Sequence, residues 1–198
     1  TIDLLALQNG KVEALGLGKV EAGTYSNLTL VLDYSTDASG NEPGCYVLTG
    51  DNAKINLAAN GNSEQELTIN QGDFAVTADE RTDVVLDFDL RKAIRYADDN
   101  GAQENEFEFV TANELEAAVR FVNREETGNV QCNCDHSNVE SDRVVVYAYS
   151  KGEFDRDAEI SGQGSSEIEF KNAVTSAVVD TRGDYQLSFL EAGDYELV

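Results

Sequence analysis

The alternation of apolar and polar residues over short runs is the feature that most restricts how this chain can fold. Five such runs lie in the first half of the sequence, at residues 25–35, 54–59, 65–70, 74–79 and 82–90. A period of two residues is typical of half-buried β-strands. The stretches between them, such as "ASGNEPG" and "NGNS", contain the Gly, Asn and Ser residues that favour tight turns. Short strands joined by turns predict an antiparallel sandwich or barrel and argue against a parallel α/β fold.

The last third of the chain repeats this plan. Runs rich in β-branched and aromatic residues occupy positions 143–150, 172–180, 184–190 and 194–198. Four strands in so short a stretch predict a second, smaller sandwich. The polar segment 151–171, which contains three glycines, predicts a mobile loop that can include one short edge strand.

Two stretches have helical features. In "DLRKAIRYA" (89–97), Asp89 is a suitable N-cap and predicts one short helix after a strand. The composition of residues 112–126 favours a helix, but apolar residues alternate within it. We therefore expect a strand over 115–122, followed by a turn at "ETG" and another strand.

These patterns together predict an all-β protein of two antiparallel β-sandwich modules, Ig-like or prealbumin-like, with at most one or two short helices. The expected modules are residues 1–125 and 126–198. The chain has 198 residues, of which 41% are hydrophobic, so it can supply a packed interior for each.

The charge of the chain restricts its partners. There are 38 acidic and 14 basic residues, which give a formal net charge of −24. Such a charge repels phosphate backbones and anionic lipid head groups, so nucleic acid and membrane surfaces are disfavoured as partners. The acidic residues are scattered through the chain, as on a heavily solvated surface. No apolar run is long enough to predict a transmembrane segment.

The phrase "EAG-x-Y" occurs twice, in "VEAGTYSNLTLV" near the start and in "LEAGDYELV" at the end. It places Gly23 before Tyr25 and Gly193 before Tyr195. Glycine allows a tight reversal of the chain, and tyrosine can pack inward while its hydroxyl finds a backbone partner. Because the flanking residues do not match, we interpret the phrase as the same structural corner used twice and not as an active site.

The stretch "AVTSAVVDTRGDYQLSFLEAGDYELV" resembles the carboxypeptidase regulatory-like, or prealbumin-like, module. Such modules end in a strand, a D-x-x-G-x-Y turn, a further strand and a G-x-Y corner. Gly183 and Tyr185 match the turn, and Gly193 and Tyr195 match the corner. The resemblance implies a structural role for these residues.

The first part resembles a different family, an uncharacterised domain of bacterial lipoproteins. The similar stretches are "IDLLALQNG" (2–10), "LGKVEAGTYSNLTLVLD" (17–33) and "VVLDFDLRKAI" (84–94). The resemblance implies an exported bacterial protein attached to the cell envelope, in the outer membrane or periplasm, by a lipid anchor upstream of residue 1. The expected function is that of a non-catalytic lipoprotein module that binds a ligand, mediates adhesion or has a structural role. The expected partner is a surface or periplasmic carbohydrate or protein.

The three cysteines are Cys45, Cys132 and Cys134. In the exported setting that the resemblance implies, a disulfide between Cys45 and either Cys132 or Cys134 is expected. The alternative is metal binding by "CNCDH", in which Cys132, Cys134 and His136 would lie on one face of a strand. However, C-x-C-x-H is not a standard zinc spacing, and a fourth ligand is not evident.

The remaining candidate chemistry is weak. "DRDAEISG" (155–162) resembles a calcium loop but lacks its D-x-D-x-D-G core. His136 is the sole histidine and has no evident nucleophile and base beside it. We therefore predict no catalytic residue, no cofactor and no metal site. A calcium- or zinc-dependent binding protein or hydrolase, using the acidic loops or "CNCDH", is the alternative function.

Overall fold

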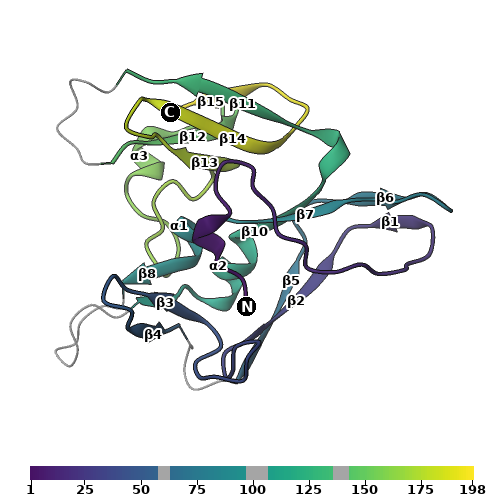
Figure 1. Cartoon of the computed structure of the whole chain (residues 1–198). Helices are drawn as coiled ribbons and strands as arrows, with labels where there is room; N and C mark the ends of the chain where they lie inside the picture. The colour runs from purple at the N-terminus through teal and green to yellow at the C-terminus, as the bar shows by residue number, and fades with distance from the viewer. Residues whose placement is uncertain (58–62, 97–106, 136–142) are drawn as a thin grey trace.

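The computed structural model describes residues 1–57, 63–96, 107–135 and 143–198 (Figure 1). In this part of the chain, strands pair antiparallel throughout, and the helices are three short α-helices and two single 3₁₀ turns. The all-β prediction with few helices is therefore confirmed. No helix among the described residues is both long enough and apolar enough to cross a membrane.

The first part of the chain is built from two-stranded sheets. After the 3₁₀ turn η1 (Leu4–Ala6), the described strands pair as β1 (Gly23–Tyr25) with β6 (Phe74–Val76), β2 (Leu28–Asp33) with β5 (Glu64–Ile69), β3 (Tyr46–Leu48) with β4 (Lys54–Asn56), β7 (Val84–Phe88) with β10 (Val119–Asn123), and β8 (Ile94–Tyr96) with β9 (Phe107–Phe109).

Strand β5 joins the two hydrophobic clusters of this part. Its alternation places Leu67 and Ile69 on one face, and both side chains are fully buried. Leu67 packs in the larger cluster with Phe109 and Leu115. Ile69 packs in the smaller one with Phe121.

The last part of the chain is a small sandwich. Its elements are β11 (Thr127–Asn133), β12 (Val145–Ser150), the helix α3 (Arg156–Glu159), β13 (Thr175–Val178), β14 (Asp184–Glu191) and β15 (Tyr195–Leu197). Strands β13, β12 and β15 form one sheet, and β11 pairs with β14 in the other. Buried side chains from both sheets, including Ala148, Ala177 and Leu187, form one cluster. This is the alternating inward face that the sequence predicts for strands 143–198.

The helix after β7 is confirmed. Helix α1 spans Leu90–Ala93, and the Asp89 carboxylate accepts a hydrogen bond from the backbone N–H of Arg91 at 3.2 Å. It ends one turn later because the chain turns extended at Ile94 to begin β8.

The strand predicted over 115–122 is wrong in its first half. Residues Ala112–Ala117 form helix α2, and the strand begins only at Val119. The reason is an N-terminal capping arrangement, in which the carboxylate of Glu114 accepts hydrogen bonds from the backbone N–H and hydroxyl of Thr111. The turn was predicted at "ETG" (126–128). The chain turns slightly earlier, in the 3₁₀ turn η2 (Arg124–Glu126), and the next strand begins at Thr127.

The loop predicted for 151–171 contains more regular structure than expected, while its mobility stays a prediction. The segment contains α3 and a β-bridge between Gln163 and Ile168, and the side chain of Ile168 is buried in the larger cluster of the first part. Figure 1 shows the chain after α3 descending from the sandwich toward α1 and β8. The expected boundary at 125/126 stays a prediction; Ile168 packs across it into the first part, and Ser166 hydrogen-bonds across it to Glu114.

Candidate ligand-binding site

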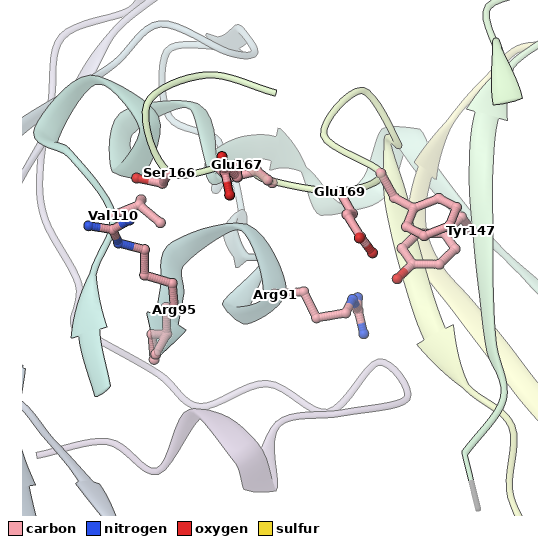
Figure 2. Close-up of a pocket in the computed structure, with 10 residues that line it drawn as sticks. Arg91, Arg95, Val110, Tyr147, Ser166, Glu167 and Glu169 are labelled. Atoms are coloured by element: carbon pink, nitrogen blue, oxygen red, sulfur yellow. The ribbon is translucent and has the colours of Figure 1, made fainter. Parts of the chain in front are cut away.

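A cavity of about 290 Å³ lies where the two parts of the chain meet (Figure 2). We call it the junction cavity. One wall comes from α1 and β8, with Arg91, Ile94 and Arg95, and the other from residues 166–170 and from Tyr147 of β12. Its lining therefore combines residues far apart in the sequence.

Two arginines form the cationic wall. The Nη2 atom of Arg91 lies 3.3 Å from the carboxylate of Asp89, and Arg95 pairs with Glu108 at 2.7 Å. The Arg91 guanidinium also lies over the ring of Tyr147, 5.5 Å from its centroid. The Nε atoms of both arginines make no hydrogen bond with the described residues. Both guanidinium groups are thus held in place with unused hydrogen-bonding capacity.

Two glutamates face this wall. Glu167 and Glu169 line the junction cavity, and neither carboxylate makes a hydrogen bond or ion pair with the described residues. Figure 2 shows Glu169 pointing toward Arg91 and the hydroxyl of Tyr147. The opposite charges therefore face one another across the cavity without direct pairing.

The backbone of this wall is strained. Glu167 and Phe170 have φ values of 51° and 53°, in the left-handed region that side-chain-bearing residues rarely adopt. The ring of Phe170 stacks on that of Tyr147, with centroids 4.2 Å apart. Strained non-glycine residues concentrate at binding and catalytic sites, where the surrounding structure must hold them.

A buried carboxylate holds the start of the strained segment. Glu114 accepts hydrogen bonds from the backbone N–H of Ser166 at 3.1 Å and from its hydroxyl at 2.6 Å, in addition to the two from Thr111. Burial raises the pKa of Glu114, but the hydrogen bonds from Ser166 and Thr111 outweigh it and lower the pKa to about 2.

A second buried carboxylate holds the end of the segment. Glu159 is 1% exposed and accepts hydrogen bonds from the hydroxyl of Tyr149 at 2.7 Å, from the side chain of Gln163 and from both nitrogens of Asn172. Burial raises its pKa, but these hydrogen bonds outweigh burial, so the pKa lies below its usual value. Glu114 and Glu159 thus fix residues 166–170 from both sides.

Comparison with known protein families assigns the first part of the chain to a family. Residues 1–107, just over half of the sequence, match the family described as a domain of unknown function, DUF4382. The chain belongs to the DUF4382 family. No curated protein and no solved structure matches it. The matched region contains Arg91 and Arg95, whereas Tyr147 and residues 166–170 lie outside it.

The cysteines of this DUF4382 protein do not form the expected bond. All three lie within the described residues, and no disulfide joins Cys45 to Cys132 or Cys134. Cys45 packs against the larger cluster of the first part, whereas Cys134 packs against the sandwich cluster, so they belong to separate cores. Cys132 is exposed on β11.

The two metal-binding alternatives find no support in the described residues. No group of three or more His, Cys, Asp or Glu side chains there could hold a metal ion. His136 of "CNCDH" lies outside the described residues. In the calcium-like stretch, Asp155 is the N-cap of α3 and accepts hydrogen bonds from the N–H groups of Asp157 and Ala158. That carboxylate is therefore engaged in capping a helix.

The two "EAG-x-Y" phrases form the same local contact. The hydroxyl of Tyr25 donates to the carbonyl of Glu21 at 2.9 Å, and the hydroxyl of Tyr195 donates to the carbonyl of Glu191 at 2.9 Å. Gly23 and Gly193 are not at positive φ, however, so these corners do not depend on the conformational freedom of glycine.

Among the predicted corner residues, it is Gly183 that needs to be glycine. Its φ is +88°, and a β-carbon there would overlap the carbonyl oxygen of Cys134. It lies in the turn that connects β13 to β14 of the other sheet, where the Asp180 carboxylate accepts hydrogen bonds from the N–H groups of Arg182 and Asp184. Tyr185, which follows, packs against the sandwich cluster.

The junction cavity was not predicted from the sequence. The one local signal for it is "LRKAIR", which places Arg91, Lys92 and Arg95 close together in a chain with only 14 basic residues. Nothing in residues 166–170 marks them as a facing wall, because their position depends on the buried contacts of Glu114 and Glu159.

Proposed function

We propose that this chain is a non-catalytic, ligand-binding module of a bacterial cell-envelope lipoprotein, and that the junction cavity is its binding site. The observation that carries the proposal is a cavity whose charged side chains face one another without pairing, beside a strained backbone held by two buried carboxylates. Small-molecule sites are concave, with a few fixed polar groups among apolar ones.

The chemistry of the lining supports binding over catalysis. Ser166 carries the one hydroxyl in the lining that contacts a carboxylate, that of Glu114. A carboxylate whose pKa is about 2 is a poor base for a serine hydroxyl at neutral pH. The contact between Ser166 and Glu114 therefore serves to position the wall.

Two observations support an envelope role: membership of the DUF4382 family, and the resemblance, noted from the sequence, of residues 173–198 to the end of carboxypeptidase regulatory-like modules. Expression of the complete precursor in a bacterial host tests the location. We expect it in the membrane fraction, with a lipid-modified N-terminal cysteine detected by mass spectrometry. An unmodified precursor in the cytosolic fraction would refute the lipoprotein assignment.

Binding at the junction cavity is tested by a crystallographic soak with a mixed library of small polar compounds. We expect electron density for a bound compound between Arg91 and Glu169, and loss of that density in Arg91→Gln. Arg124→Gln is the matched control, because Arg124 is exposed in η2, away from the cavity. Compounds bound only at other surfaces would contradict the proposal.

A further inference from the structure

Building on the proposed function, we infer that the junction cavity binds a neutral, polyhydroxylated ligand, a single sugar unit of a glycan. The inference rests on three properties of the lining: the balance of its charges, the hydrogen-bonding roles of its polar groups, and the apolar surface between them.

The charges of the lining cancel. Arg91 and Arg95 lie on one wall, and Glu167 and Glu169 on the other. An anionic ligand would gain from the arginines but would be repelled by both carboxylates, and a cationic ligand would meet the reverse situation. The four lining side chains sum to zero charge, and each arginine is also paired outside the lining, Arg91 with Asp89 and Arg95 with Glu108, so the cavity has no surplus positive charge for an anion.

The polar groups of the lining require a ligand that can both accept and donate hydrogen bonds. A guanidinium only donates hydrogen bonds and a carboxylate only accepts them, whereas a hydroxyl does both. Two such sets are present. Figure 2 shows Arg91, Glu169 and Tyr147 at one end of the cavity and Arg95, Glu167 and Ser166 at the other. A compound with several hydroxyls can satisfy both sets at once, while a compound with one ammonium and one carboxylate leaves half of the groups unmatched.

The remaining lining is apolar. Ile94, Val110, Ile168 and Phe170 lie between the charged groups and offer contact to the C–H faces of a sugar ring. A volume of about 290 Å³ is at the small end for ligand sites, so one sugar unit is expected to fit rather than an oligosaccharide. With so few atoms in contact, a dissociation constant on the order of 1 mM is expected.

The test is NMR titration of the ¹⁵N-labelled protein with five probes. These are the neutral sugars glucose and N-acetylglucosamine, the anion glucuronate, the cation glucosamine, and the zwitterion glycylglycine. We expect the neutral sugars to shift the amide signals of residues 94, 110 and 166–170 with saturation, and the charged probes to bind at least tenfold more weakly.

Matched variants locate the binding. Arg91→Gln and Glu169→Gln are each expected to weaken binding of the neutral sugar about tenfold, because each loses a charge-assisted hydrogen bond. Arg124→Gln and Glu66→Gln, both exposed and away from the cavity, should leave binding unchanged. Unchanged amide spectra outside the cavity show that each variant is folded.

The outcomes separate the ligand class from the proposed function. Saturable binding of glycylglycine, glucuronate or glucosamine at residues 166–170 without neutral-sugar binding would overturn the sugar inference and leave the cavity as a binding site. Binding of neutral sugars that Arg91→Gln and Glu169→Gln do not weaken would also overturn it. If no probe perturbs the cavity and the crystal soak is negative, both proposals fail.

Discussion

The substitution Glu114→Gln tests whether a buried carboxylate holds the wall of the junction cavity. Its carboxylate accepts four hydrogen bonds, two of them from Ser166, which lies 52 residues away in the sequence. The fold lowers the pKa of Glu114 from its ordinary value of 4.5 to about 2. Because the charged form is favoured by the fold, this difference corresponds to about 3 kcal/mol of folding free energy.

The pH dependence of this contribution has a definite sign. The pKa of Glu114 is lower in the folded protein than in the unfolded chain, so its stabilisation is fully present above about pH 4.5 and is lost as the pH falls toward 2. At neutral pH we expect Glu114→Gln to lower the free energy of unfolding by about 2 to 3 kcal/mol, since the amide keeps the shape but accepts fewer hydrogen bonds. The difference between the two proteins should shrink below pH 4.

Urea unfolding followed by circular dichroism, repeated from pH 7 to pH 3, measures both effects. The control is Glu66→Gln on β5, an exposed glutamate for which a change within about 0.5 kcal/mol is expected. The reasoning would be refuted by a Glu114→Gln effect no larger than that of the control, or by one that stays constant across this pH range.

Three further predictions concern the sandwich and the thiols. Gly183→Ala should lower the free energy of unfolding by about 1 to 3 kcal/mol because of its positive φ, whereas Gly193→Ala should be nearly neutral; equal effects in thermal unfolding would contradict this. Cys132 is exposed, whereas burial and then Asp33 raise the pKa of Cys45, so Cys132 should react first with a thiol reagent at neutral pH, as peptide mapping can show. Tyr149→Phe should cost about 1.5 to 3 kcal/mol in urea unfolding, because the buried hydroxyl donates to a charged glutamate; a cost below 0.5 would argue against that hydrogen bond.

The strands were predictable because their signal is local. Alternation in residues 65–70 requires no knowledge of the rest of the chain, and β5 buries the residues that the pattern places on one face. The Asp89 cap was predictable for the same reason. At residues 112–117 two local signals competed, and the capping contact of Thr111 with Glu114 outweighed alternation.

The junction cavity could not be predicted because its parts meet only through tertiary contacts. Arg91 and Glu169 are distant in sequence, and their approach depends on hydrogen bonds that span the two parts of the chain. The charge composition does not indicate which acidic residues are buried. In a chain with scattered acidic residues, nothing distinguishes Glu114 or Glu159 from the exposed ones. A buried glutamate is recognisable only when its donors are known.

The two buried carboxylates and the strained wall make sense together. Two left-handed non-glycine residues cost about 1 to 3 kcal/mol each, so Glu167 and Phe170 would relax if the segment were free. Glu114 binds Ser166, immediately before them, and Glu159 binds Asn172, shortly after them. Hydrogen bonds to a charged group typically contribute about 1.5 to 3 kcal/mol, which is comparable with the strain of one such residue. If these contacts served stability alone, a loop without strained residues would give the fold a lower free energy. We therefore attribute the strain to the placement of residues 166–170 against the arginines. Under the proposed function, Glu114→Gln should weaken binding at the junction cavity in the NMR titration as well as the fold.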